Sequence, residues 1–291
     1  MDILGTGLSG LVGSRITQIL SDEYSFIDLS KETGYDILDF PSVRRVFSET
    51  NAPVVFHFAA YTDVAKAQEE KDQGKDSLSW QVNVSATKHI VELCQETGKK
   101  LVYLSTDYIF DGRKDSYCES DEGNPISWYG RTKYEGELLV RSLGSKALTL
   151  RISTPYRARP VGKIDFVHKI LEKVRNGETI HAPTDQYFTP TFIDDLAFSL
   201  KTLLTHVSSG IYNIGARECV TAYEAAFNIA QCYGVAGSHI QKTTYEAYFR
   251  GKAKPPRHAC LKHDKIDALG VDLCSFLEGI RKVQKEEGIS L

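Results

Sequence analysis

The sequence predicts an α/β fold with a parallel sheet, and several of its features lead to that prediction. In the first half of the 291-residue chain, short apolar runs alternate with longer amphipathic segments, as in repeated strand–helix–strand units. Residues 53–57 and 100–105 carry apolar side chains with little polar alternation, which is typical of strands buried on both faces. A glycine-rich stretch also separates the first strand-like run from the first amphipathic segment.

Each element follows from its own pattern. We expect strands at residues 2–6, 24–28, 53–57, 100–105 and 147–152, and helices at residues 10–20, 40–50, 77–97 and 128–143. Past residue 150 the pattern loosens, with helices expected at 167–175, 192–204, 221–232 and 273–284 and a strand at 210–214. The prediction is a sheet domain of residues 1–150 with a return segment at about 190–215. Residues 151–189 and 216–291 then form a smaller α/β part.

The composition excludes several classes of protein. The chain has 42% hydrophobic and 25% charged residues, which is typical of a globular protein. Its net charge of −3 lacks the excess of positive charge that is typical of proteins that bind a nucleic acid polymer. No apolar run approaches the ~20 residues of a membrane span, and the N-terminus lacks the basic start of a signal peptide. We therefore expect a cytoplasmic protein that is not bound to a membrane.

The cysteines predict neither a metal site nor a redox motif. No pair among the six has the short spacing of a zinc knuckle or a redox-active dithiol. In a reducing cytoplasm, the expectation is that all remain free thiols.

The glycine-rich stretch predicts a dinucleotide-binding loop. Gly7, Gly10 and Gly13 allow a tight turn, a close approach of the backbone to a pyrophosphate and close helix–strand packing. Gly5 and Gly7 also form a GxG pair, so the spacing alone fits either variant of the fingerprint. The following helix would offer its N-terminus to the phosphates. This predicts a doubly wound sheet of the Rossmann type whose first domain binds a dinucleotide through Gly7, Leu8, Ser9, Gly10, Leu11 and Val12.

An acidic residue at the end of the second strand bears on the choice of cofactor. Asp28 is placed to accept hydrogen bonds from the adenosine ribose, although a helix cap or a surface position would also explain it. Its charge would repel a 2′-phosphate, and only Lys31 lies nearby as a counter-charge. NAD is therefore favoured over NADP. Asp36 and Ile37 are candidates for contact with the adenine ring.

A tyrosine and a lysine four residues apart suggest the reaction chemistry. Tyr129 and Lys133 lie on one face of the predicted helix 128–143. A neighbouring ammonium lowers the pKa of a phenol, so that the phenol can donate a proton to a carbonyl oxygen. This pairing suits hydride transfer from a nicotinamide to a ketone.

Together these segments resemble the extended short-chain dehydrogenase/reductase superfamily, and within it the dTDP-4-dehydrorhamnose reductase family. The similar segments follow the family order and cover roughly residues 2–215: residues 6–13, 58–63, 105–112, 129–133, 150–153 and 185–191. The resemblance implies that Tyr129 is the general acid, that Lys133 tunes it and holds the nicotinamide ribose, and that Thr106 binds the substrate carbonyl. Further implied cofactor contacts are Phe58, Ala59, Ala60, Tyr61 and Asn83, and implied substrate contacts are Asp107, Thr154, Gln186 and Arg257.

The chain departs from the family pattern around the sugar. Thr154 stands where the family commonly has a tryptophan, and Pro155 should restrict Thr154 to extended conformations. The family's Arg-Pro-x-Asn-Ser segment survives only in part, at residues 255–261, so Arg257, Lys252 and Lys254 are the available diphosphate contacts. The resemblance therefore implies an NAD(P)-dependent reductase of a 4-keto nucleotide sugar, with the identity of the sugar open.

Other functions within the resemblance also stay open. A 4,6-dehydratase is disfavoured because Tyr108 stands where such enzymes carry a glutamate. A cofactor-binding regulatory subunit similar to that of methionine adenosyltransferase is an alternative, because proteins of the same fold can have different functions. A nucleotide-sugar epimerase is another alternative. A homodimer is a further expectation.

Overall fold

A computed structural model describes residues 1–207 and 209–289, and its centre is a parallel sheet of six strands. The strand order is β2-β1-β3-β4-β5-β8. The predicted α/β fold with a doubly wound parallel sheet is confirmed. The strands of this sheet are β1 (Asp2–Thr6), β2 (Ser25–Leu29), β3 (Val54–His57), β4 (Lys100–Thr106), β5 (Ala147–Ile152) and β8 (Gly210–Ile214).

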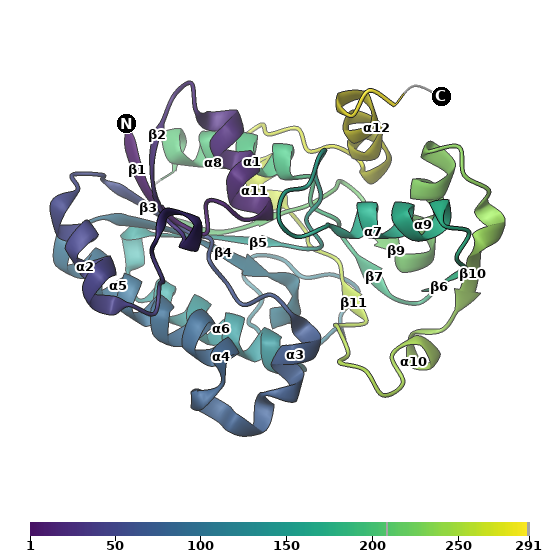
Figure 1. Ribbon diagram of the computed structural model, residues 1–291, viewed down its shortest axis with the longest axis horizontal. Helices are drawn as coiled ribbons and strands as arrows, with labels where there is room; N and C mark the ends of the chain where they lie inside the picture. Colours follow the sequence, from purple (N-terminus) through teal and green to yellow (C-terminus); the bar gives the residue numbers. More distant parts are fainter. Residues whose placement is uncertain (208, 290–291) are drawn as a thin grey trace.

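Helices cover both faces of the sheet, as Figure 1 shows. Ile3 and Leu4, adjacent on β1, are both fully buried because successive strand residues point to opposite faces. Ile3 packs in the core beneath one helical layer and Leu4 in the core beneath the other. The first layer contains α1 (Leu11–Leu20), α8 (Ile193–His206) and α11 (Asp264–Asp267), and the second contains α2 (Phe40–Glu49), α5 (Ala86–Thr97) and α6 (Trp128–Arg141).

The order of the strands determines where a ligand can bind. The chain passes from β1 outward to β2 and then returns to the other side of β1 to form β3. Such a reversal opens a crevice at the carboxyl ends of the strands, the usual ligand site in this type of sheet.

The predicted helix at residues 77–97 is interrupted. It begins as α4 (Leu78–Trp80), continues through a π-helical turn at Gln81–Ser85 and ends as α5. Single π turns of this kind are frequent at functional sites. Asn83 lies in this turn, and α3 (Val64–Glu69) precedes α4 in the chain.

The smaller part contains two small sheets with their own helices, and it lies to the right of the large sheet in Figure 1. Side-chain caps begin its long helices: Asp165 for α7, Thr221 for α9 and Ser275 for α12. Its strands are β6 (Ile180–Pro183), β7 (Tyr187–Phe188), β9 (Val220–Thr221), β10 (Ile240–Thr243) and β11 (His258–Ala259). Its helices are α7 (Phe166–Arg175), α9 (Ala222–Cys232), α10 (Tyr245–Tyr248) and α12 (Phe276–Glu286).

The chain crosses between the two parts more than once. Residues 193–214 return to the large sheet as α8 and β8. Ile266 and Leu273 also pack in the core of the large sheet, although the sequence places them in the smaller part. The short apolar segment that contains them has no sequence pattern that predicts in which core it packs.

A disulfide joins Cys219 and Cys260, whose Cα atoms lie 5.5 Å apart. The expectation of six free thiols is wrong for this pair. The two cysteines are 41 residues apart in the chain and meet because β9 and β11 both pair with β7. A search for short cysteine spacings cannot find such a pair.

Among residues 1–207 and 209–289, no helix has the length and apolar character needed to cross a membrane. Within the same residues, no group of three or more His, Cys, Asp or Glu side chains is arranged to hold a metal ion.

Candidate active site

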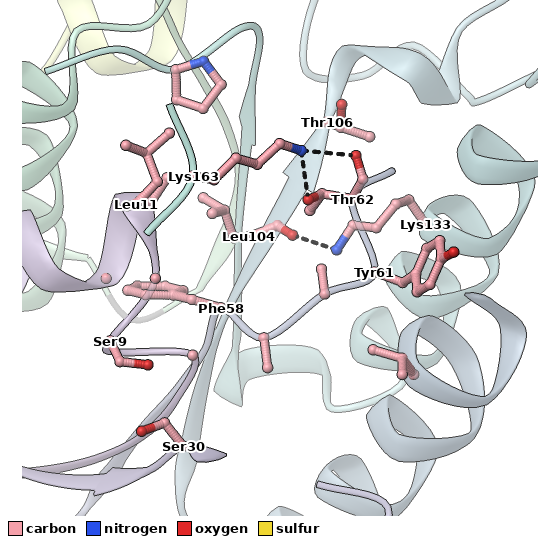
Figure 2. A pocket seen from close by; sticks show the side chains of 18 of the residues that line it. Ser9, Leu11, Ser30, Phe58, Tyr61, Thr62, Leu104, Thr106, Lys133 and Lys163 are labelled. Atoms are coloured by element: carbon pink, nitrogen blue, oxygen red, sulfur yellow. Dashed lines mark hydrogen bonds between the residues drawn. The ribbon is translucent and has the colours of Figure 1, made fainter. Parts of the chain in front are cut away.

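A cavity of about 780 Å³ opens at the carboxyl ends of β1, β3 and β4, where the order of the strands reverses. Its walls come from both parts of the molecule. The phosphate loop and the segment after β3 form one side, α6 forms another, and residues 163–169 of the smaller part complete it. Figure 2 shows this arrangement from close by.

The glycine loop is packed too closely for side chains. Gly7 has a φ of +68°, and a Cβ there would lie 2.4 Å from the Ala59 backbone nitrogen. A Cβ on Gly13 would lie 2.3 Å from the Gly7 carbonyl oxygen. Gly10 precedes α1 without a side-chain cap, so the first N–H groups of this helix face the cavity. The loop therefore fits a pyrophosphate at the helix N-terminus.

The adenosine end of the cavity differs from the sequence-based expectation. Asp28 does not line the cavity; its Oδ2 accepts a hydrogen bond from Ser30 at 2.8 Å, and its Oδ1 is buried without a partner. Glu32 does line the cavity and accepts a 2.6 Å hydrogen bond from the Ser9 hydroxyl. Lys31 forms an ion pair with Asp36 at 3.1 Å. The acid nearest to the phosphate loop is thus Glu32, which sequence reasoning missed.

Thr106, Tyr129 and Lys133 lie together on the cavity wall and are nearly fully buried. Thr106 ends β4, while Tyr129 and Lys133 lie on the same face of α6, whose first turn is capped by the Ser127 hydroxyl. Lys133 Nζ donates a 2.8 Å hydrogen bond to the Leu104 carbonyl oxygen, which is drawn in Figure 2. An ammonium group, a phenol and a hydroxyl group thus line the same cavity.

Burial shifts the proton affinities of this group in opposite directions. It raises the pKa of Tyr129, and a hydrogen bond with Thr106 offsets only part of that effect. Burial also lowers the pKa of Lys133 to about 7, against the opposing charge of Glu137. The expectation that Lys133 leaves Tyr129 with a lowered pKa is therefore wrong for this structure. Desolvation is the main cause of the raised pKa of Tyr129, and the charge of Asp107 acts in the same direction.

The lowered pKa of Lys133 makes protein stability depend on pH. The unfolded chain, with an ordinary lysine pKa of ~10.4, binds more protons than the folded protein between about pH 7 and pH 10. Across this window, the unfolding free energy of the wild type relative to Lys133→Met should rise with pH, by up to about 1.4 kcal/mol per unit. Chemical denaturation of both proteins at several pH values would measure it, and a flat difference would contradict the shift.

Asn83 connects the segment after β3 to α6. Its Oδ1 accepts from the Tyr61 backbone N–H at 2.8 Å, and its Nδ2 donates to the Tyr61 carbonyl at 3.1 Å and to the Thr132 hydroxyl at 2.9 Å. Because Thr132 is next to Lys133 on α6, Asn83 holds this helix in register with the cofactor loop. Asn83 itself lies behind the cavity wall and does not line it.

A second polar group lies beside Thr106, toward the expected sugar site. Asp107 is buried and accepts hydrogen bonds from Ser153 at 2.6 Å and Thr106 at 3.0 Å. Burial raises the pKa of Asp107 to about 6, against these hydrogen bonds. Thr154 lines the cavity with a φ of +37°, so the expectation of an extended Thr154 is wrong. A positive φ is unusual for a β-branched residue and marks local strain at this wall.

Most of the expected site residues line the cavity. They are Gly7, Ser9, Gly10, Leu11, Val12, Asp36, Ile37, Phe58, Ala59, Ala60, Tyr61, Thr106, Asp107, Tyr129, Lys133 and Thr154. Leu8 instead packs in the core beneath the loop. Gln186 and Arg257 lie outside the lining, and Arg257 forms a 2.6 Å ion pair with Asp185.

Residues from the smaller part also line the cavity, and sequence reasoning missed them. Lys163, Asp165, Phe166 and Lys169 reach the wall opposite the cofactor loop. Lys163 Nζ donates to the Thr62 hydroxyl at 3.1 Å and to the Thr62 carbonyl at 3.3 Å, as Figure 2 shows. No local motif marks this segment, because its place beside Thr62 depends on how the two parts pack.

Comparison with known proteins identifies the family of the chain. The family model described as "RmlD substrate binding domain" matches residues 1–288. A probable low-salt glycan biosynthesis reductase of Haloferax volcanii is 29% identical over 90% of each chain. The methionine adenosyltransferase 2 subunit beta of Danio rerio is 28% identical, over 96% of this chain and 88% of its own.

A solved structure is similar over nearly the whole length. The dTDP-4-dehydrorhamnose reductase of Bacillus anthracis, in complex with NADP, superposes with a TM-score of 0.88 at 27% identity and covers 98% of this chain and 99% of its own. With its cavity at the strand reversal and Tyr129 and Lys133 on one helix face, the chain belongs to the dTDP-4-dehydrorhamnose reductase (RmlD) family of the extended short-chain dehydrogenase/reductase superfamily.

Proposed function

We propose that the protein is an NAD(P)-dependent reductase of a 4-keto nucleotide sugar. The observation that supports this best is the grouping of Thr106, Tyr129 and Lys133 on the wall of one cavity with the phosphate loop. The close backbone packing at Gly7 and Gly13 fits a bound dinucleotide, which would supply the hydride.

The side chains of the chain itself then carry the proton chemistry. Thr106 donates a hydrogen bond to the substrate carbonyl oxygen, and Tyr129 donates the proton that this oxygen gains. Lys133, held by the Leu104 carbonyl, orients the nicotinamide ribose and compensates charge on the phenolate. A phenol of raised pKa keeps its proton at neutral pH, so the acid form needed for reduction is the form present.

The pocket for the sugar favours a substrate other than dTDP-4-dehydrorhamnose. Thr154 offers a hydroxyl and a methyl group, whereas a tryptophan would offer a broad stacking face. Asp107 and Ser153 beside it add polar groups. We expect weak turnover of dTDP-4-dehydrorhamnose and faster turnover of another nucleotide-linked ketosugar.

Oxidation of reduced nicotinamide over a panel of 4-keto sugar nucleotides would test this. A kcat/KM of ~10⁴ M⁻¹s⁻¹ or more with dTDP-4-dehydrorhamnose would contradict the substrate prediction. Absence of turnover with every sugar, at saturating cofactor, would contradict the reductase itself.

We expect NADH to bind more tightly than NADPH. The carboxylates of Glu32 and Asp36 line the adenosine end of the cavity, and Lys31, which also lines it, is paired with Asp36. A 2′-phosphate would meet this negative potential. Calorimetry should give a lower Kd for NADH, and Glu32→Gln should reduce the difference. A lower Kd for NADPH with the wild type would show that the prediction is wrong.

The similarity to methionine adenosyltransferase 2 subunit beta favours a second candidate, a cofactor-binding regulatory subunit. This subunit would bind the dinucleotide in the same cleft without turning over a sugar. Cofactor binding by calorimetry, joined with no oxidation of reduced nicotinamide across the panel, would favour this candidate.

A further inference from the structure

The cavity contains two ammonium groups for which the proposed reaction has no role. Lys163 and Lys169 both line it from the smaller part. Lys163 contacts only neutral oxygen atoms, the hydroxyl and carbonyl of Thr62. Among residues 1–207 and 209–289, no carboxylate oxygen lies within 4.0 Å of either lysine nitrogen.

Other cations near the smaller part have acidic partners. Lys254 pairs with Glu246, and Arg257 pairs with Asp185, each at 2.6 Å. Arg257, Lys254 and Lys252, the diphosphate contacts expected from the sequence, all lie outside the cavity lining, and the first two are neutralised by these acids. Among the described residues that line the cavity, Lys31 pairs with Asp36, whereas Lys163 and Lys169 form no ion pair.

The charge of Lys169 acts on the ammonium group of Lys163. Partial burial at the cavity mouth and the charge of Lys169 both lower the pKa of Lys163, and Asp63 opposes them only in part. Lys163 and Lys169 are exposed to solvent at the cavity, and an anion bound between them would relieve the repulsion between their charges. This is the electrostatic pattern of an anion site.

Asp165, which also lines the cavity, does not pair with either lysine. Asp165 caps α7, and its Oδ1 accepts from the His168 backbone N–H at 3.0 Å and lies 2.8 Å from the His168 ring nitrogen Nδ1. Its Oδ2 accepts from the Arg157 backbone N–H at 3.1 Å. Because both oxygens of Asp165 accept these hydrogen bonds, the charges of Lys163 and Lys169 are not neutralised by it.

We propose that Lys163 and Lys169 form a binding site for a diphosphate on the wall opposite the phosphate loop. Lys163 would exchange the Thr62 oxygens for phosphate oxygens, and Lys169, on the first turns of α7, would contact the same group. The phosphate loop already offers a helix N-terminus to a dinucleotide. The opposite wall therefore suits the diphosphate of the nucleotide-linked substrate, an assignment that rests on the proposed function. The diphosphate of the cofactor has the same chemistry.

Calorimetry with the full-length protein separates these sources. The probes are dTDP, UDP, thymidine, uridine, NADH and NADPH, titrated into the wild type, Lys163→Gln, Lys169→Gln and the double variant. A charge-assisted hydrogen bond contributes about 1.5–3 kcal/mol, so each single variant should weaken nucleoside diphosphate binding by roughly 10- to 100-fold. Lys163→Arg should retain most of the affinity, and nucleoside binding should not change.

Lys173→Gln is the matched control, because Lys173 lies exposed on α7 and outside the cavity lining. It should bind all probes as the wild type does, and thermal melting should show that all variants remain folded. A smaller salt dependence of diphosphate affinity in the double variant would further support direct charge contacts.

The outcomes are distinct. Loss of dTDP and UDP affinity with unchanged NADH and NADPH affinity supports a substrate diphosphate site, whereas loss of cofactor affinity alone assigns the same lysines to the cofactor diphosphate. Equal affinities of wild type and double variant for every diphosphate would overturn the proposal. Because binding is measured without turnover, a protein that lacks reductase activity would still give a clear answer.

Discussion

Replacing Tyr129 by phenylalanine should reduce kcat by about 10²- to 10⁴-fold, which is the usual contribution of a general acid. The phenol lies on the cavity wall beside Thr106, and it is the phenol that shares a helix face with Lys133. Asp107 and Tyr108 are the other acidic groups that line the cavity next to Thr106 in the chain. Since the ring is retained, Tyr129→Phe should bind NADH with nearly unchanged affinity. Steady-state kinetics joined with calorimetry would measure both effects.

Tyr134→Phe is the control for this change. Tyr134 lies on the same helix, but its hydroxyl donates to Glu122 at 2.7 Å and does not line the cavity. This variant should keep the wild-type rate. If Tyr129→Phe also kept it, the proton would have to come from another group, and Asp107 would be the first to test.

Replacing Glu137 by leucine should lower the unfolding free energy by about 3–5 kcal/mol, because it leaves a fully buried guanidinium without its carboxylate. Arg151 on β5 bonds Glu137 on α6 through Nη2 at 2.7 Å, and neither side chain is exposed. Burial alone would raise the pKa of Glu137, but Arg151 and Ser105 hold it below its ordinary value. Urea denaturation would measure the loss.

A double variant distinguishes this ion pair from simple packing. Arg151→Met combined with Glu137→Leu removes both charges, so it should be more stable than Glu137→Leu alone. Glu96→Gln, which breaks an exposed pair with Arg44, should leave the midpoint nearly unchanged. If the double variant were less stable than Glu137→Leu alone, the buried charge would not be the cause of the loss.

Local patterns predicted the parts of the site that depend on neighbours in the chain. The close turn at Gly7–Gly13 follows from residues a few positions apart, and a spacing of four places Tyr129 and Lys133 on one helix face. The buried strands β3 and β4 follow from uninterrupted apolar runs. In each case the determining interactions lie within one turn or one strand.

Local patterns failed where burial or a distant segment decides. Asp28 ends the expected strand, yet its carboxylate turns to Ser30 and lies off the cavity. The sequence indicated that Lys133 would lower the pKa of Tyr129, but the cost of removing charge from water dominates and raises it. Thr154 was expected to be extended because of Pro155, whereas its φ is +37°.

By itself, then, the sequence determined the doubly wound sheet, the phosphate loop, the Tyr129–Lys133 pair and, through its resemblance, the family, because these depend on periodicity and on short spacings. The tertiary structure alone decided that Lys163 meets Thr62 and that Cys219 meets Cys260, contacts between segments far apart in the chain. The first contact arises from the packing of the smaller part on the large sheet, and the second arises from the pairing of β9 and β11 with β7. Both depend on many weak contacts summed over the folded chain. A short stretch of sequence cannot predict the result of these summed contacts. The cavity wall formed by the smaller part is therefore known only from the folded structure.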